Sequence, residues 1–295
     1  MNQYFLGVDG GQSSTTAIIA DETGRILSIG TGGPCYEVES AILGALKDNA
    51  HLHFRAVCLG FSGGPKDKED LVRKLISADE YSITNDGIIA LIGATGGQPG
   101  IIVVAGTGSI AYSRNARGET SRAGGWGHIY GDEGGGFDIA REAVRAALRM
   151  EEGWGPATTL LDKLLSATES ENANDLMHRF YTPEFPRPRV AAYSKLVDQA
   201  AREGDRIAIE ILNRAAQQLA GFAASVRSTG FHPRENPIVC PVGNVYKSEI
   251  LRARFEMLTE NCQSPLYGPA SGALIEAARL AGISLDTTHL PRAEK

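Results

Sequence analysis

YFLGVDGGQSSTTAIIAD, residues 4–21, is the part of the chain on which the predicted fold depends. Residues 4–8 and 16–20 are short, mostly apolar runs, and such runs favour β-strands. The link between them, Asp9-Gly10-Gly11-Gln12-Ser13-Ser14, is polar and rich in glycine. Small residues leave backbone N–H groups free to turn toward a common point, where they bind anionic oxygens. These residues therefore predict a strand, an anion-binding loop and a returning strand.

The same order of elements returns near residue 106. Residues 101–105 are wholly apolar and lead into Gly106-Thr107-Gly108-Ser109. A punctuating stretch, Gly96-Gly97-Gln98-Pro99-Gly100, precedes this second copy and is typical of a domain transition. We therefore predict an internal duplication, with one domain over residues 1–98 and a second over residues 99–282.

Strands and helices alternate along the rest of the chain, which indicates an α/β fold with helices covering the sheets. The polar tail, residues 283–295, is expected to be loosely held against the first domain. Further strands are predicted at residues 25–30, 55–60, 81–84 and 237–242. Apolar periodicity predicts helices at residues 38–50, 67–78, 87–93, 137–150, 190–203, 207–227, 248–261 and 270–281.

The composition excludes several classes of protein. With 295 residues, 42% of them hydrophobic and 22% charged, the chain is long enough for two domains with separate cores. The formal net charge is −6 and no block of Lys or Arg occurs, so we expect neither nucleic acid nor a membrane as partner. Four cysteines without metal-binding spacing and no signal-peptide pattern indicate a cytoplasmic protein without zinc: Cys35, Cys58, Cys240 and Cys262.

Residues 124–136, GGWGHIYGDEGGG, form the most unusual stretch of the chain. They hold seven glycines, the acidic pair Asp132 and Glu133, and the rings of Trp126 and Tyr130. Glycine is expected where the backbone bends at positive φ or approaches something closely. One interpretation is a long surface loop. The other is a ligand-contacting loop whose carboxylate leads into the next helix.

Two motifs suggest other functions, each on weak grounds. Gly106-x-Gly108-x-x-Ala111 resembles a dinucleotide fingerprint, but that fingerprint opens a helix, whereas the residues after Ser109 look strand-like. Gly60-x-Ser62-x-Gly64 fits the nucleophile elbow of hydrolases, but Pro65-Lys66-Asp67 separates Ser62 from the predicted helix. A serine hydrolase that uses Ser62 stays open as a minor alternative.

The two glycine loops are better explained as a pair. Each follows the first strand of its domain and offers small residues, free N–H groups and hydroxyls. Two such loops are suited to hold a triphosphate across an interdomain cleft. Asp9, at the mouth of the first loop, is suited to hold Mg²⁺ through water. The alternative is that these glycines belong to ordinary turns.

Five motifs occur in an order that resembles the N-acetylglucosamine kinase and BadF/BadG/BcrA/BcrD ATPase family of the actin–hexokinase–sugar kinase superfamily. The resemblance covers roughly residues 4–282 and is most specific around Trp126 and Asp132. It implies two ribonuclease-H-like (actin-like ATPase) domains around an interdomain cleft, with ATP and Mg²⁺ as cofactors, and a homodimer. The motifs are DGG…S at residues 9–13, Asn85-Asp86, GTGS at residues 106–109, GGWGH…GDEG at residues 124–134, and Gly243-Asn244-Val245.

The resemblance also implies a role for each motif. Asp86 falls on the residue that activates the acceptor hydroxyl of the sugar. The implied phosphate loops are Asp9, Gly10, Gly11, Gln12 and Ser13, and then Gly106, Thr107, Gly108 and Ser109. The implied adenosine turn is Gly243, Asn244 and Val245. The positions implied to touch the sugar, besides Asp86, are Thr107, Gly125, Trp126 and Asp132.

The chemistry of phosphoryl transfer agrees with these roles. The reaction needs positioning, charge neutralisation and a carboxylate near the acceptor hydroxyl. An aspartate carboxylate is ionised at neutral pH, so Asp86 is suited to accept a proton, although it could equally cap the helix that begins at Gly87. Asp132 suits pairs of sugar hydroxyls, with a helix-start carboxylate as its alternative. For Trp126, packing as a structural ring is slightly favoured over stacking on the sugar.

Three positions depart from the family pattern. Gln12 stands where a third glycine is usual, Gly135 stands where serine is usual, and Gly33-Pro34-Cys35-Tyr36 lacks an asparagine that touches the sugar. We therefore predict an ATP-dependent kinase of an amino sugar, N-acetylglucosamine or a related hexosamine, and leave the exact sugar open. The alternative with the same fold is a non-kinase ATPase, a sugar sensor or an activator of a partner enzyme.

Overall fold

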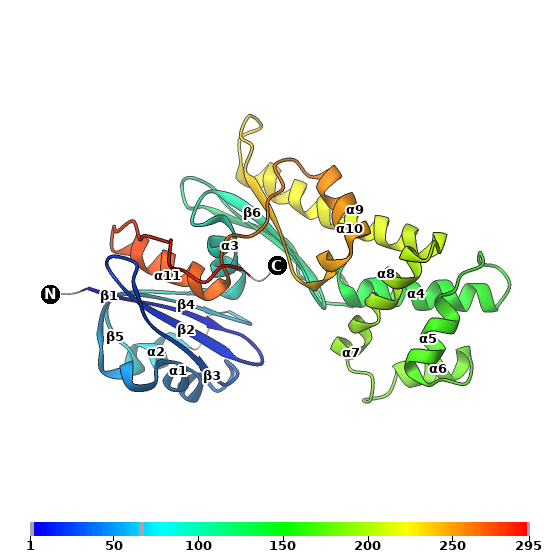
Figure 1. Cartoon of the computed structure of the whole chain (residues 1–295), viewed down its shortest axis with the longest axis horizontal. Helices are drawn as coiled ribbons and strands as arrows, with labels where there is room; N and C mark the ends of the chain where they lie inside the picture. Colours follow the sequence, from blue (N-terminus) through cyan, green and yellow to red (C-terminus); the bar gives the residue numbers. More distant parts are fainter. Residues whose placement is uncertain (1–2, 65–67, 294–295) are drawn as a thin grey trace. The chain divides into compact units, whose positions relative to one another are not determined.

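The computed structural model describes residues 3–64 and 68–293, which contacts divide into two compact units. Unit 1 comprises the chain up to Gly100, the segment Arg114–Gly118 and the chain from Ser264 onward. Unit 2 comprises Ile101–Ser113 and Glu119–Gln263. Each unit holds one β-sheet with helices packed against it, which confirms the α/β prediction (Figure 1).

Unit 1 is built on a five-stranded sheet in the order β3-β2-β1-β4-β5. Strand β2 runs antiparallel to β1 and β3, whereas β4 runs parallel to both β1 and β5. The strands are β1 (Tyr4–Gly10), β2 (Thr15–Asp21), β3 (Ile26–Gly32), β4 (His53–Phe61) and β5 (Ser77–Asn85). The helices are α1 (Val38–Leu46), the short η1 (Lys47–His51), α2 (Glu69–Leu75), α3 (Asp86–Thr95) and α11 (Pro269–Leu280).

Helices cover both faces of the unit 1 sheet, and the alternation of side chains along β1 divides them between two cores. Leu6 and Val8 pack on the face that α1 and α2 cover. Phe5 packs on the opposite face with Ile89 of α3 and Leu274 of α11. Figure 1 shows α3 and α11 on one side of this sheet and α1 and α2 on the other. A strand buried on both faces is expected to be apolar almost throughout, as β1 is.

Helix α11 packs closely on strand β1 and on helix α3 because a glycine lies at each contact. A Cβ atom at Gly7 of β1 would lie 2.3 Å from the backbone nitrogen of Leu274. A Cβ atom at Gly272 would lie 2.0 Å from the carbonyl oxygen of Ile89. The chain thus returns to unit 1 at Ser264, whereas we expected the return near residue 283. Helical periodicity identifies α11 but does not show which sheet the helix covers.

Unit 2 contains a four-stranded sheet in the order β8-β7-β6-β9, and most of the helices (Figure 1). Its core combines the apolar side chains of β6 with one face each of α4 and α9. The strands are β6 (Gly100–Ala105), β7 (Ser109–Arg114), β8 (Thr120–Gly124) and β9 (Ile238–Val242). The helices are α4 (Gly136–Glu151), α5 (Leu160–Thr168), α6 (Ala173–Phe180), α7 (Arg187–Ala192), α8 (Ser194–Arg202), α9 (Arg206–Gly230), η2 (Asn244–Lys247) and α10 (Glu249–Leu258).

The predicted helix at residues 67–78 is too long. Helix α2 ends at Leu75, and Ser77 already pairs with His53 in the parallel ladder between β5 and β4. These residues form a strand and do not continue the helix, because pairing with the buried strand β4 satisfies their backbone N–H and C=O groups. Residue Asp67, the predicted start of the helix, lies outside the described residues.

Within the described residues, the structure contains no helix that is both long and apolar enough to span a membrane.

Candidate active site

Two carboxylates stand at one edge of the unit 1 sheet. Asp9 near the end of β1 is in register with Gly60 of β4, which is in register with Thr84 of β5. Asp86 follows two residues after Thr84, as the first residue of α3. Because β1, β4 and β5 are parallel, their carboxyl ends meet at one edge of the sheet, where ligands bind in open α/β sheets. The fold therefore brings together the predicted metal-binding residue and the predicted base.

Asn85, and not Asp86, caps helix α3. The Asn85 Oδ1 atom accepts a hydrogen bond of 3.0 Å from the backbone N–H of Ile88, in the geometry of an N-cap. Asp86 Oδ1 accepts a hydrogen bond of 2.9 Å from the neighbouring Gly87 N–H. The expectation that Asp86 might equally serve as the cap is therefore wrong. Capping by Asn85 leaves the second carboxylate oxygen of Asp86 available for chemistry.

At this edge, the carboxyl group of Asp9 has a shifted pKa. Burial raises its pKa, the negative charge of Asp86 raises it further, and the resulting pKa is about 6. Among residues 3–64 and 68–293, no ion pair offsets the charge of Asp9 or Asp86. Two neighbouring carboxylates without a cationic partner suit a divalent cation, and Mg²⁺ is usually held by one or two carboxylates plus substrate phosphates. No group of three or more His, Cys, Asp or Glu residues that could hold a metal ion occurs in the described part of the chain.

The loop after β1 is held by its own backbone and by its neighbours. The Gly11 N–H donates to the Ser14 carbonyl oxygen at 2.9 Å. The Gly10 and Gly11 carbonyl oxygens accept from the N–H groups of Ser62 and Cys35, each at 2.9 Å. The carbonyl groups of the loop are thus turned toward the protein. In the described structure the N–H groups of Gln12 and Ser13 have no acceptor, so they are available to an anion.

The structure argues against both competing motifs. Ser62 enters a turn through Gly63 and Gly64, both at positive φ, and helix α2 begins only at Glu69. The strand-to-helix elbow that a serine nucleophile needs is therefore missing. The loop at Gly106 leads directly into strand β7 and not into a helix, so the dinucleotide fingerprint is excluded.

The second predicted phosphate loop, in unit 2, rests on the start of helix α4. The Gly106 and Thr107 carbonyl oxygens accept from the N–H groups of Gly136 and Phe137, at 2.8 and 3.0 Å. The Gly106 N–H donates to the Gly108 carbonyl oxygen at 2.9 Å. Among the residues that the structure describes, none accepts from the N–H groups of Thr107 and Gly108. The carbonyl groups of this loop again face the protein while N–H groups stay free.

The predicted adenosine turn lies beside this loop, because β9 is the neighbour of β6. Gly243 has φ 112°, and a Cβ atom there would lie 2.4 Å from the Ala105 carbonyl oxygen. Only glycine fits so close to the strand that carries the loop. Asn244 is exposed, whereas the side chain of Val245 is buried in the core of unit 2. Val245 is thus suited to anchor the turn, and Asn244 to contact a ligand.

The glycine-rich stretch, residues 124–136, runs from the end of β8 to the start of α4. Gly125 has φ 72°, and a Cβ atom there would lie 2.4 Å from the Ile110 side chain. Trp126 and Tyr130 are 68% and 85% exposed. The prediction that Trp126 packs as a structural ring is therefore wrong. The positive-φ glycines turn the backbone back on itself and leave these rings at the surface.

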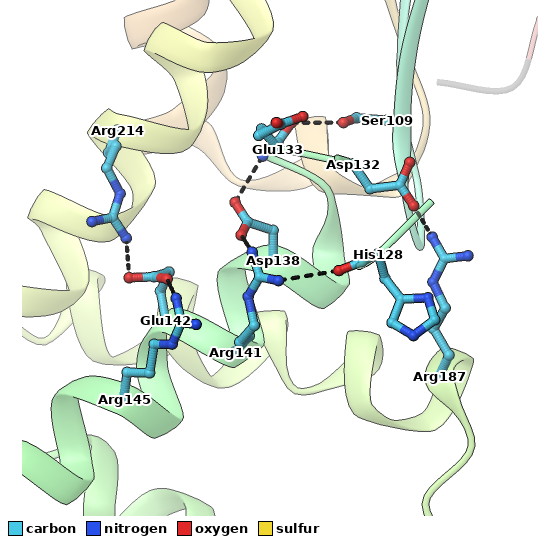
Figure 2. Close-up of polar contacts among 11 residues, drawn as sticks. Ser109, His128, Asp132, Glu133, Asp138, Arg141, Glu142, Arg145, Arg187 and Arg214 are labelled. Atoms are coloured by element: carbon cyan, nitrogen blue, oxygen red, sulfur yellow. Dashed lines mark hydrogen bonds and ion pairs between the residues drawn. The ribbon is translucent and has the colours of Figure 1, made fainter. Parts of the chain in front are cut away.

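Asp132 is buried at φ 62°, in the left-handed region that few non-glycine residues occupy. Its Oδ2 atom forms an ion pair with Arg187 of helix α7 (Figure 2). The carboxylate at the start of α4 is instead Asp138, whose Oδ2 accepts from the Gly134 N–H at 3.0 Å. The helix-start alternative for Asp132 is therefore wrong. Strained backbone of this kind clusters at functional sites.

Helix α4 holds the glycine-rich stretch at two points. Asp138 receives the Gly134 N–H and forms an ion pair with Arg141. The Arg141 Nη1 atom donates to the His128 carbonyl oxygen at 3.1 Å (Figure 2). From the other side, the Ser109 hydroxyl donates to the Glu133 carbonyl oxygen at 2.6 Å. One ion pair thus fixes both the middle and the end of the stretch.

Three of these residues were not predicted from the sequence. Asp138 and Arg141 are three positions apart in the first turns of α4, a spacing that favours an ion pair on a helix. That spacing could have identified the pair, although not its contact with His128. Arg187 gives no comparable signal, because it pairs with a residue 55 positions away.

Comparison with known proteins agrees with the motifs. Residues 6–277 match the sequence model of the BadF/BadG/BcrA/BcrD ATPase family. An N-acetylmuramic acid/N-acetylglucosamine kinase from Clostridium acetobutylicum is 34% identical over 236 residues, which cover 74% of this chain and 77% of the relative. An N-acetyl-D-glucosamine kinase from Dictyostelium discoideum is 31% identical over 280 residues, 84% of this chain and 88% of the relative.

The fold is also similar to that of solved structures. The crystal structure of a candidate N-acetylglucosamine kinase from Chromobacterium violaceum superposes with a TM-score of 0.70 at 25% identity. The superposition covers 92% of this chain and 98% of that chain. The sequence match spans nearly the whole length of both described units. The chain therefore belongs to the BadF/BadG/BcrA/BcrD ATPase family.

Proposed function

We propose that this protein is an ATP-dependent kinase of an amino sugar, with N-acetylglucosamine or a closely related hexosamine as the acceptor. The observation that carries the proposal is the pair Asp9 and Asp86 at the carboxyl ends of parallel strands. The names of the relatives support the choice of substrate, since both curated relatives above are kinases of N-acetylglucosamine.

In the proposed reaction, a sugar hydroxyl oxygen attacks the γ-phosphorus of ATP in line. The bond from that phosphorus to the bridging oxygen breaks, the hydroxyl proton passes to the Asp86 carboxylate, and ADP leaves. Such a transfer depends on positioning and charge neutralisation more than on covalent chemistry by the protein. Mg²⁺ held near Asp9 would neutralise phosphate charge.

Other residues of the two units supply binding in this proposal. The free N–H groups of Gln12 and Ser13, and those of Thr107 and Gly108, bind phosphate oxygens. Gly243 and Asn244 contact adenosine. On the sugar, Asp132 accepts hydrogen bonds from hydroxyls and Gly125 permits close backbone approach. The exposed Trp126 offers the part of its ring that Arg122, 4.8 Å from the ring centroid, leaves open. We further propose a cytoplasmic homodimer.

A coupled assay of ADP release over a sugar panel tests the proposal. The panel contains N-acetylglucosamine, N-acetylmuramic acid, glucosamine and glucose, each with ATP and Mg²⁺. We expect ADP release that depends on an amino sugar, and formation of the matching sugar phosphate by mass spectrometry. ADP release without any sugar dependence would instead indicate an ATPase of the same fold, and no turnover would indicate a sensor.

A further inference from the structure

Among the residues that the structure describes, Asp132 has one cationic partner, and that partner lies far away in the sequence. The Asp132 carboxylate is buried, and Arg187 Nη2 forms an ion pair with its Oδ2 atom. Arg187 is the first residue of α7, which follows a proline-rich connection. In Figure 2 the guanidinium approaches Asp132 from the opposite side to the Asp138–Arg141 pair. Asp132 is therefore held by a contact that is independent of the clamp on the rest of the stretch.

This ion pair also touches the loop at Gly106. A Cβ atom at Gly108 would lie 2.5 Å from Asp132 Oδ2 and 2.6 Å from Arg187 Nη2. The pair therefore occupies the space that any side chain at Gly108 would need. Three segments meet at this point: the phosphate loop, the glycine-rich stretch and the start of α7.

The environment of Arg187 favours a functional explanation. Its Nε atom is buried and has no hydrogen-bond partner in the described structure, which costs about 1–3 kcal/mol. The Arg187 side chain is 34% exposed, and a partly exposed ion pair adds little to stability. Stability alone therefore does not account for an arginine here. Orientation of the Asp132 carboxylate does account for the arginine, because the planar guanidinium fixes the direction of the oxygen that it binds.

We infer that Arg187 is a positioning residue, which aligns Asp132 so that the second carboxylate oxygen can accept hydrogen bonds from sugar hydroxyls. The inference rests on the proposed function, because it assigns a role in recognition of the same sugar. Arg187 neutralises the charge of Asp132 and leaves hydrogen-bonding capacity on the other oxygen. Loss of a group that orients a ligand-binding side chain weakens binding by about 10–100-fold at metal sites, and we expect a similar range here.

The decisive experiment is a double-mutant cycle on Arg187 and Asp132, measured on the full chain with N-acetylglucosamine and ATP. We expect R187M to raise the KM for the sugar by about tenfold or more, while kcat and the KM for ATP change less than about threefold. In the D132N background, R187M should add no further increase, because the partner through which it acts is gone. R187K, which keeps the charge but not the planar guanidinium, should fall between wild type and R187M.

Arg189 offers a matched control on the same helix. It pairs with Glu184 at the surface and has no contact with Asp132 among its hydrogen bonds. R189M should leave the KM for the sugar unchanged. Near-ultraviolet circular dichroism and thermal melting of each variant show whether it is folded, and R187Q replaces R187M if that variant does not fold.

Two kinds of failure are distinguishable in this experiment. If wild type shows no sugar-dependent turnover, the proposed function fails. If wild type turns over and R187M keeps the wild-type KM for the sugar, only the role of Arg187 is overturned. The role of Arg187 is also overturned if the effects of R187M and D132N on the KM for the sugar are additive, because Arg187 would then not act through Asp132.

Discussion

Asp9 and Asp86 flank the carboxyl end of β4, and Gly60 lies in register between their strands. Burial, and after it the charge of Asp86, raises the pKa of Asp9 to about 6. The absence of a cationic partner among the described residues leaves this edge of the sheet electrostatically unsatisfied. A divalent cation would satisfy it, whereas folding alone does not.

The first prediction concerns the stability of unit 1 as a function of pH. The pKa of Asp9 is higher in the folded chain than its ordinary value of 3.8, so the folded state binds the proton more tightly between about pH 4 and 6. The ionised carboxylate therefore destabilises the fold above pH 6. D9N should raise the free energy of unfolding at pH 8 by up to about 3 kcal/mol, since each pKa unit corresponds to about 1.4 kcal/mol. The gain should shrink as the pH falls from 6 toward 4, measured by urea unfolding.

Asp21 supplies a control of opposite sign in the same sheet. Its pKa is lowered by hydrogen bonds, first from the Thr23 hydroxyl at 2.6 Å. D21N should therefore destabilise the protein at neutral pH. If D9N lowered stability at pH 8, as D21N is expected to do, the account of Asp9 would be refuted.

The second prediction concerns the base. D86N removes the proton acceptor but leaves the loop at residues 9–14 and the cap at Asn85 in place. We expect sugar phosphorylation to fall by at least about 100-fold while ATP binding, measured by calorimetry, persists. D79N, on the exposed part of β5 where Asp79 pairs with His53, should keep wild-type turnover. Near-normal turnover of D86N would remove Asp86 from the mechanism.

The third prediction uses Gly108. Alanine there would push against the flexible ends of Asp132 and Arg187, and not against backbone. G108A should therefore melt within a few degrees of wild type, yet its KM for the sugar should rise by about tenfold. The matched variant is G221A, because Gly221 lies within α9 with open space around it. G221A should be neutral in the assay and slightly more stable, by about 0.5–1 kcal/mol. A wild-type KM in G108A would show that the pair tolerates displacement.

The fourth prediction concerns the clamp on the glycine-rich stretch. R141M removes the hydrogen bond to His128 and leaves the buried Asp138 without its cation. We expect a loss of about 1–3 kcal/mol in stability and faster amide exchange over residues 127–134. Arg145, one turn further along α4, pairs with Glu142 at the surface, and R145M should change stability by less than about 1 kcal/mol. Equal effects of the two variants would mean that the clamp adds nothing beyond a surface ion pair.

The fifth prediction concerns Trp126, one of two tryptophans in the chain. In W154F, fluorescence reports on Trp126 alone. Addition of N-acetylglucosamine should shift or quench this emission, because a sugar stacked on an exposed ring displaces water from it. The converse variant, W126F, leaves only Trp154 and should show no response to the sugar. An unresponsive W154F that still turns over the sugar would place Trp126 outside the sugar site.

The parts of the site that short stretches of sequence determine could be predicted. The loop after β1 is an example, because apolar runs on either side of a glycine-rich link leave few alternatives. The role of Asp86 came from the family resemblance, and its place after a predicted strand agreed with that role. What failed there was the choice of cap, since Asn85 and Asp86 are both good caps and only the backbone geometry separates them.

The parts that depend on contacts distant in sequence could not be predicted. Nothing near Arg187 indicates its pairing with Asp132, and the left-handed backbone of Asp132 is set by the turn around it. The exposure of Trp126 likewise depends on how glycines at positive φ direct the chain. The unit against which α11 packs could not be predicted either, because its apolar face would suit either sheet.

The close packing of α11 on Gly7 has a consequence for biosynthesis. Strands β1 and β4, which are translated before unit 2, carry Phe5 and Cys58 on a face that α3, α11 and the segment after α11 cover. Helix α11 is translated after all of unit 2. The nascent chain must therefore hold an incomplete first unit, with part of one apolar face open to water, until α11 has been translated. Chaperone binding during that interval would be expected at this face, and unit 2 would complete its own core first.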